Sequence, residues 1–468
     1  MKILFVGATV HPCVSATGKM TLAVAKSLTR DGHEVHCVDE LYRADHNKTI
    51  VIDGIFAHTK PQKPKKINAE SNVEAIQPSK GLKAFLREAP VLGKLYFGLY
   101  KVKHAIVSLP SLLSNLKENR RLSKENKSLA KYYGKIYKTP YMYDKYQPNV
   151  YLNAITDLND KHQFDAIVAQ VVPFTSMVAV YWFKEKHPET PILVYAVDAI
   201  SDIGAYMGFS AEYMEQAGFE WEKRVYPHCA GIIEMASHRE HYSAPPFNMF
   251  AEKMHYADPP FLIENNSSPS SYFSKEHTNL LYTGAINNSF VPFEVSLEFF
   301  SKLRNSCNIK YCIFGFGEDI PMVKNYTASS GGSIHYGGRL NSEDVPIFQK
   351  NADILVSVGT NGSKQITSKI FEYMATGNKI VHFSIDPQDV CIPYYEKYPN
   401  VLVLRVSDSF ETNAAKFSDF LIQPKTDISF EAIQKLFPAA VPDFTAALIE
   451  KILATPENLA CNSRRSVL

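Results

Sequence analysis

Two short apolar runs joined by a helical pattern constrain the fold of this chain more than any other feature. Residues 352–358 and 379–383 have the length and the β-branched content of buried parallel strands. The pattern between them predicts a helix over about 368–376. Such a helix begins at the carboxyl edge of the first strand, which is where ligands bind in open α/β sheets.

The predicted helix also carries residues suited to a phosphate and a ribose. Thr367 and Ser368 are N-cap residue types and Gly377 is a C′ type. The N-terminus of a helix favours an anion, and Lys369 adds a full positive charge in the same turn. Glu372 tilts back toward that end and is placed to accept hydrogen bonds from ribose hydroxyls. An ordinary capped helix with a solvated lysine and glutamate is the alternative interpretation.

Similar strand patterns recur along the chain in two series. They lie at 2–6, 34–39, 165–170, 191–198 and 231–234, and then at 279–284, 309–315 and 333–337 before the two runs already described. The fold class predicted is therefore α/β, with two facing Rossmann-like domains and a cleft between them. We expect an N-terminal domain over 1–260 with an insertion at about 50–150, a linker over 261–275, a second domain over 276–440, and a terminal helix over 441–468 that packs there or crosses back to the first domain.

Length and composition agree with two soluble domains. A chain of 468 residues is too long for one core, and 45% hydrophobic with 21% charged residues is ordinary for a globular protein. The seven cysteines show no CxxC or Cys/His ligand spacing, which indicates reduced thiols. The apolar run at the N-terminus is too short for a signal peptide or a membrane span. We expect a cytoplasmic protein.

Glycines follow the predicted strands of the second series, where they let a ligand approach the backbone. They are Gly284, Gly315 with Gly317, and a glycine pair between Tyr336 and Arg339. A single glycine in such a place usually marks only a turn. Three sets beside an anion-facing helix favour a nucleotide pocket.

The segment 15–19 resembles a phosphate-binding loop, because Gly18 and Lys19 follow the first strand. A Walker A loop needs a glycine where Cys13 stands and a serine or threonine where Met20 stands, so an ATPase is excluded. No GxGxxG follows the first strand either, which argues against NAD or FAD. We expect this loop and Lys19 to form the second wall of the cleft, facing the donor phosphates.

Together these segments resemble a GT-B glycosyltransferase, in particular family 4 of the retaining enzymes that use nucleotide sugars. The resemblance covers most of the chain outside about 50–150 and rests on 31–35, on 314–317 and above all on 368–377. It implies that Glu372 binds the donor ribose, the 368–369 turn binds the diphosphate, with Thr367 also expected at the donor site, and the loop after Tyr336 binds the base.

The chain departs from the family pattern at two places. The paired glutamates of the family stand eight positions apart, and the position eight before Glu372 is Lys364. Asn361, Gln365 and Thr367 are candidates to replace the missing carboxylate. The basic residue usual after Gly284 is also absent, and Lys369 and Arg339 are its expected substitutes.

A same-face retaining transfer needs no protein nucleophile, because the leaving diphosphate can take the acceptor proton. We therefore expect no metal and no cofactor. His11 and Asp198 are the first-domain residues expected to act on the acceptor, with Gln170 and Asp202 as further candidates. For each of these four, a role in shaping a loop is the alternative.

A basic segment at 80–138 holds fourteen Lys or Arg against three Glu, a net charge of about +11 by subtraction. Apolar residues recur in it at helical spacing, as in helices that bind an anionic membrane surface. A solvated basic face is equally consistent. Nucleic acid is disfavoured, since no helix-turn-helix, RNP or zinc pattern is present.

The function predicted is transfer of a sugar from a nucleoside-diphosphate sugar to a glycan or lipid-linked acceptor in polysaccharide assembly. The partners expected are this donor, that acceptor and an anionic membrane surface, which would place the protein on the cytoplasmic face of a membrane. A nucleotide-sugar 2-epimerase of the same fold is one alternative. A non-catalytic nucleotide-sugar-binding or scaffold protein is another.

Overall fold

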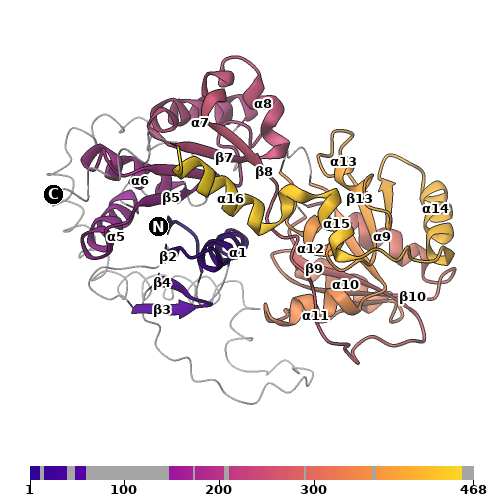
Figure 1. The fold of residues 1–468 in the computed structure, drawn as a ribbon. Helices are drawn as coiled ribbons and strands as arrows, with labels where there is room; N and C mark the ends of the chain where they lie inside the picture. The colour runs from indigo at the N-terminus through magenta and orange to yellow at the C-terminus, as the bar shows by residue number, and fades with distance from the viewer. Residues whose placement is uncertain are drawn as a thin grey trace, which may run out of the picture.

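The computed structural model describes residues 1–10, 15–39, 48–59, 147–171, 174–204, 210–288, 291–360 and 365–455. Within this part, strands and helices alternate and build two separate sheets, which form a first lobe and a second lobe (Figure 1). The predicted α/β class with two Rossmann-like units is confirmed. His11, Asn361, Lys364 and the segment 80–138, all discussed above, lie outside the described residues.

The first sheet has the order β3-β4-β2-β1-β5-β6-β7-β8. Its strands are β1 (Lys2–Val6), β2 (Glu34–Val38), β3 (Lys48–Ile52), β4 (Ile55–Thr59), β5 (Ala166–Gln170), β6 (Ile192–Ala196), β7 (Gly231–Met235) and β8 (Met254–Ala257). Every neighbouring pair is parallel except the β3–β4 hairpin. Side chains alternate between two cores: Ile3 and Phe5 of β1 pack on one face, and Leu4 and Val6 pack on the other.

Helices cover both faces of this sheet, so its central strands are buried on both sides. They are α1 (Ala16–Arg30), α5 (Gln147–His162), α6 (Thr175–Lys186), α7 (Ala211–Val225) and α8 (Arg239–Ser243), with 3-10 turns at Tyr226–His228, Ala236–His238 and Phe247–Lys253. Helix α1 begins directly after Ser15, which caps it by accepting from the Gly18 N–H at 2.9 Å. This start places Lys19 in the first turn.

The second sheet has the order β11-β10-β9-β12-β13-β14, and all its pairs are parallel. Its strands are β9 (Thr278–Ala285), β10 (Ile309–Phe316), β11 (Ile334–Tyr336), β12 (Ile354–Val358), β13 (Lys379–Ser384) and β14 (Val401–Arg405). Its helices are α9 (Glu294–Leu303), α10 (Ile320–Ser329), α11 (Asp344–Asn351), α12 (Lys369–Met374), α13 (Ile392–Tyr395), α14 (Phe410–Ile422) and α15 (Phe430–Leu436). The strand order reverses between β9 and β12, which is where such sheets bind ligands.

Helix α12 is shorter than predicted, and its start differs in detail. Ser368 has helical backbone angles (φ −55°, ψ −29°) and makes no side-chain cap hydrogen bond within the described residues. A serine caps a helix from an extended backbone, so the expected Ser368 cap is wrong. The C-terminal expectation is met: Gly377 has φ +71°, and its N–H donates to Met374 O at 3.0 Å.

The last helix returns to the first lobe. Helix α16 (Pro442–Leu453) follows a 3-10 turn at Pro438–Ala440 and lies against α1, as its yellow ribbon shows in Figure 1. Asp443 accepts hydrogen bonds from Ser27 at 2.5 Å and Arg30 at 2.8 Å. Gly231 leaves room for Ile452, whose carbons would come within 2.9 Å of any Cβ there. One apolar core therefore includes residues of both lobes.

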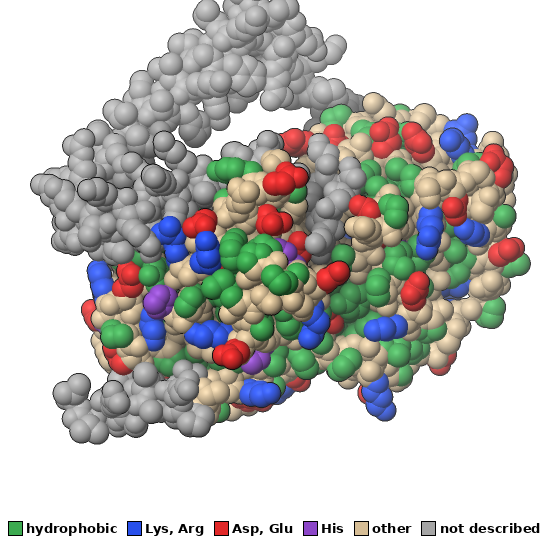
Figure 2. Space-filling view, turned by 90° about the horizontal axis from the view of Figure 1, so that it is seen from above, with side chains coloured by type: hydrophobic (Ala, Val, Ile, Leu, Met, Phe, Trp, Pro, Cys, Tyr) green, Lys and Arg blue, Asp and Glu red, His purple; other side chains and the backbone are tan. Residues whose placement is uncertain are grey.

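The surface of the described residues carries no single-sign field on the face seen in Figure 2, where basic and acidic side chains lie interspersed over both lobes. Among the described residues, none of the helices has the length and apolar character needed to cross a membrane.

Candidate functional site

A cavity of about 800 Å³ lies between the lobes, at the carboxyl end of the second sheet. The second lobe contributes the ends of β9 and β10, the segment 339–345 after β11, and the start of α12. The first lobe contributes Ser15, Ala16 and Lys19 of the α1 start, and Phe261 lines the cavity from the segment that connects the sheets. The cavity therefore occupies the switch point between β9 and β12.

Glycine is needed at the end of β9 because of its backbone angle, and the Lys369 side chain lies beside it. Gly284 has φ +144°, and a Cβ there would lie 2.4 Å from Lys369 Cε. The Lys369 ammonium therefore lies across the strand end, 5.2 Å from the centre of the Tyr282 ring. Gly315 is also required, because its Cβ would lie 2.1 Å from Gly284 O. Both glycines line the cavity as predicted from the sequence.

Glu372 points toward the opposite lobe. Its Oε1 lies 4.0 Å from Lys19 Nζ, and its Oε2 accepts from Gln349 Nε2 at 3.4 Å. Gln349 also donates to Thr283 Oγ1 at 3.0 Å, so the amide links β9 to α12. The Glu372 side chain is 20% exposed, and its ion pair with Lys19 bridges the two lobes.

Three basic side chains line the cavity: Lys19, Arg339 and Lys369. The Arg339 guanidinium stacks over Phe316, 4.6 Å from the ring centre. The Phe316 ring is 52% exposed, so an aromatic surface and a cation lie side by side at the cavity wall. Basic groups from both lobes thus surround a space large enough for a nucleotide.

Four predicted donor-binding residues lie behind the wall rather than in it. A Cβ on Gly18 would lie 1.9 Å from Thr9 O, and one on Gly317 would lie 1.9 Å from Ile286 O. The Tyr336 hydroxyl donates to Gly315 O at 3.0 Å, and Thr367 O accepts from the Ile370 N–H at 3.2 Å. Among the described residues, these four do not line the cavity but shape the loops that carry the lining residues.

Several lining residues were not identified from the sequence. Phe261, Thr283, Phe316 and the segment 340–345 come from a connecting segment, a buried strand and a loop. None of them has a residue type that signals ligand binding without the fold. Ser15 was recognised only as part of a loop, although its cap on α1 sets the direction of Lys19.

Buried carboxylates gather at the carboxyl ends of β6 and β7 in the first lobe. We name Asp198, Asp202, Glu222 and Glu234 the buried acid cluster; the last three are buried, and Asp198 is partly exposed. Glu222 accepts from the Ser201 N–H at 3.1 Å, and from the Ser201 and Tyr242 hydroxyls at 2.9 and 2.7 Å. The Tyr226 and Tyr242 hydroxyls donate to Glu234 at 3.1 and 3.2 Å.

Burial dominates the proton affinity of this cluster. It raises the pKa of Glu222 to about 7, and it raises the pKa of Glu234 well above its usual range with help from the Glu222 charge. Burial also raises the pKa of Asp198 to about 6, against the opposing effect of His238. Asp202 orients His238, whose Nδ1 lies 3.0 Å from its Oδ2. Carboxyl groups in this cluster therefore hold protons near neutral pH.

The residues predicted to act on the acceptor do not lie together in one site. Asp198 follows β6 at the carboxyl edge of the first sheet, two strands along from β1, and does not line the 800 Å³ cavity as the described residues define it. Gln170 is fully buried and donates to Thr21 Oγ1 at 2.8 Å, so it ties β5 to α1. Asp202 supports His238 inside the cluster.

No protein-family model matches this chain, and no curated protein matches it by sequence. Solved structures do match. The α,α-trehalose-phosphate synthase (UDP-forming) from Burkholderia xenovorans, in complex with glucose-6-phosphate, has a TM-score of 0.60 and 7% identity over 97% of this chain and 100% of that chain. The catalytic domain of starch synthase IV from Arabidopsis thaliana, bound to ADP and acarbose, has a TM-score of 0.52 and 10% identity over 97% and 98%.

A third match is the trehalose-6-phosphate structure from E. coli bound with UDP-2-fluoro glucose, with a TM-score of 0.55 and 9% identity over 97% of this chain and 99% of that chain. At these identities the likeness establishes the fold. The chain has the GT-B fold, and its structural neighbours are glycosyltransferases.

Proposed function

We propose that this chain is a glycosyltransferase that moves a sugar from a nucleoside-diphosphate sugar to a glycan or lipid-linked acceptor, with retention of configuration. One observation carries the proposal: Lys19, Arg339 and Lys369 surround an interlobe cavity at the switch point of the second sheet, beside Glu372. Structural neighbours bound with ADP or with UDP-2-fluoro glucose support a nucleotide sugar as the ligand.

In this proposal the donor diphosphate binds near Lys369 and Arg339, and Lys19 closes on it from the first lobe. Glu372 receives the ribose hydroxyls. Its present partners, Lys19 and Gln349, mark it as a carboxylate that accepts hydrogen bonds in the cavity. The base lies along the segment after Tyr336, where Phe316 and Arg339 offer an aromatic ring and a guanidinium.

The chemistry proposed requires few protein groups. As the bond from the sugar to the diphosphate breaks, the cations stabilise the charge that develops on the leaving oxygen. The acceptor hydroxyl attacks from the same face and gives its proton to that oxygen, so no nucleophilic side chain and no metal is needed. Asp198 and His11 are proposed to orient the acceptor, since Asp198 lies at the carboxyl edge of the facing sheet.

The lipid-linked acceptor and a position on the inner face of a membrane remain part of the proposal. The net charge of about +11 over 80–138 supports them, because basic segments bind anionic lipid surfaces. Flotation of the full chain with anionic vesicles at low and high salt tests this part alone. Failure to float at low salt removes the membrane contact and leaves the sugar transfer untouched.

The transferase itself is tested with a panel of UDP-, GDP- and ADP-sugars. We expect one nucleotide to stabilise the protein and its sugar to be released or transferred with retained configuration. Binding of a nucleotide sugar without any turnover would sink the transferase and leave a binding protein. Conversion of the donor to its C2 epimer would instead assign the epimerase.

A further inference from the structure

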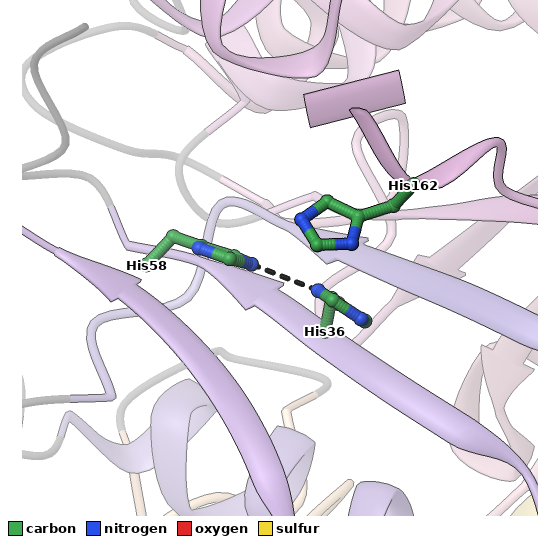
Figure 3. Close-up of side chains that lie close together, drawn as sticks. All are labelled: His36, His58 and His162. Carbon is green, nitrogen blue, oxygen red and sulfur yellow. Dashed lines mark hydrogen bonds between the residues drawn. The ribbon is translucent and has the colours of Figure 1, made fainter. Parts of the chain in front are cut away.

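Three histidines meet in the first lobe, outside the lining of the interlobe cavity (Figure 3). His36 lies on β2, His58 on β4 and His162 at the last residue of α5. One ring nitrogen of each lies within 4.8 Å of the others. His36 and His58 are buried, whereas His162 is partly exposed, so solvent can reach the group from the side of α5.

The outer nitrogens of the two buried rings are held by other side chains. His36 Nε2 lies 3.0 Å from Glu34 Oε1, and His58 Nδ1 lies 3.0 Å from Thr49 Oγ1. A carboxylate only accepts, so His36 carries its proton on Nε2 and turns the lone pair of Nδ1 inward. When His58 donates to the Thr49 hydroxyl, its Nε2 lone pair also faces inward.

Outer partners of this kind fix the tautomer of histidines that bind metals. The inward nitrogens, His36 Nδ1 and His58 Nε2, are 2.8 Å apart, as the dashed line in Figure 3 shows. Two lone pairs at that distance repel each other unless a cation lies between them. Without a metal, His58 instead carries its proton on Nε2 and donates it to His36 Nδ1, its Nδ1 accepts from the Thr49 hydroxyl, and His36 Nε2 donates to Glu34, so the two rings form a neutral hydrogen-bonded chain.

The third ring is what this proton chain does not explain. His162 makes ring contacts with His36, His58 and Phe164, but it makes no hydrogen bond or ion pair with the described residues. Its ring centre lies 4.5 Å from that of His36. A metal ion that takes one nitrogen from each of the three rings gives His162 a partner.

We propose that His36, His58 and His162 bind one zinc ion. Zn²⁺ prefers neutral imidazole nitrogens at about 2.0–2.1 Å in a tetrahedral arrangement, which puts ligand nitrogens about 3.3 Å apart. In the structure, the nitrogens of His36 and His58 are 2.8 Å apart, and one nitrogen of each of the three rings lies within 4.8 Å of the others. The ideal spacing falls inside this range. Water fills the fourth position on the exposed side.

The surrounding charges permit a cation at this place. The two lysines near the rings are already paired, Lys2 with Glu34 at 3.7 Å and Lys161 with Asp157 at 2.9 Å. Zinc binds the neutral form of imidazole, and the burial of His36 and His58 favours that form.

The zinc would join two parts of the chain that are far apart in sequence. Strand β4 ends at Thr59 and α5 begins at Gln147, so His58 and His162 stand on either side of the segment 60–146. Closing a long loop at its base stabilises the folded state. The role inferred is structural, and it departs from the expectation that the chain binds no metal.

The test uses the full chain without a histidine tag, stripped of metal with a chelator and titrated with Zn²⁺. We expect one tightly bound zinc per chain by elemental analysis and a higher melting temperature than for the stripped protein. His162→Gln should lose the bound zinc and the gain in melting temperature. The control His228→Gln, at an exposed histidine of the same lobe, should keep both.

Two further measurements guard against a variant that merely misfolds. X-ray absorption of the zinc-loaded natural chain should show three imidazole nitrogens, with no variant involved. Glu34→Gln should keep one zinc but bind it about 10- to 100-fold more weakly, because the carboxylate only orients His36. The proposal is overturned if the natural chain retains no zinc after reloading, or if His162→Gln binds zinc as tightly as the natural chain.

Discussion

The two lobes place opposite kinds of ionisable group at the carboxyl edges of their sheets. The second lobe presents Lys369 and Arg339 to an open cavity, whereas the first lobe buries Glu222 and Glu234 and partly buries Asp198. A solvated cation keeps its charge and can neutralise a ligand. A buried carboxyl group gives up its charge because water is excluded. This contrast supports the proposal that the anionic donor binds to the second lobe and the acceptor to the first.

Removing a cation from the cavity should have the largest effect on turnover. Lys369→Ala should lower turnover about 100- to 1000-fold, because it removes a positive charge from the developing leaving group. Steady-state rates with the donor found in the panel provide the measurement. Lys324→Ala, at an exposed lysine of α10, is the matched control and should behave as the natural chain. Equal losses in both variants would show that Lys369 does not face the diphosphate.

The buried acid cluster should show itself in the pH dependence of stability. Burial raises the pKa of Glu222 from 4.5 to about 7, so between these values the folded state binds a proton that the unfolded chain lacks. The free energy of unfolding should fall by roughly 2–3 kcal/mol as the pH rises through this window. Glu222→Gln should flatten that slope in denaturant titrations.

Glu215 lies on the same helix, α7, but is exposed. Glu215→Gln therefore serves as the control and should keep the slope of the natural chain. If Glu222→Gln also keeps it, the carboxyl group is ionised in the folded protein throughout this pH range.

A change at the proposed acceptor site should have a smaller effect on the transfer rate. Asp198→Asn should lower the transfer rate about 10- to 100-fold through a misplaced acceptor, while the affinity for the nucleotide stays unchanged. Calorimetry with the nucleotide and a transfer assay measure the two quantities. Asp419→Asn, on the exposed side of α14, is the control. A fall in nucleotide affinity at Asp198 would place it in the donor site.

The smallest effect is expected at the end of β9. Gly284→Ala places a Cβ against the Lys369 side chain and strains a backbone at φ +144°. Because the lysine can move aside, we expect only about tenfold weaker nucleotide binding and a loss of about 1–3 kcal/mol in stability. Gly332→Ala, at φ +97° with open space around it, carries a comparable strain away from the cavity. It should lose stability and keep nucleotide affinity.

The strands were predictable because buried parallel strands leave a dense apolar signal. The run 2–6 matches β1 at both ends, and the run 379–383 falls short of β13 by one residue. Strands β3, β4, β8 and β14 were not predicted. Strands β3 and β14 are edge strands whose side chains are mostly exposed or partly exposed, and β8 is only four residues long, so none of these three has a strong apolar pattern. Strand β4 is mostly buried, but it lies in the region expected to be an insertion.

The candidate site was partly predictable for a different reason. Lys369, Glu372 and the strand-end glycines follow a recognisable order in the chain, and the structure brings them to one cavity. Thr367 and Tyr336 have the expected residue types but support the wall from behind. Whether a side chain faces a cavity depends on how its helix or strand is turned about its own axis. Tertiary packing fixes that orientation.

The sequence by itself determined that this chain forms an α/β protein with two sheets and a helix that begins at the carboxyl edge of β12, because apolar periodicity and glycine placement are local properties. Only the tertiary structure decided that Lys19 of α1 meets Glu372 of α12, and that three histidines from β2, β4 and α5 gather in one place. These contacts join residues remote in the chain. Their distances are fixed by how the sheets and helices pack, and no local pattern records them.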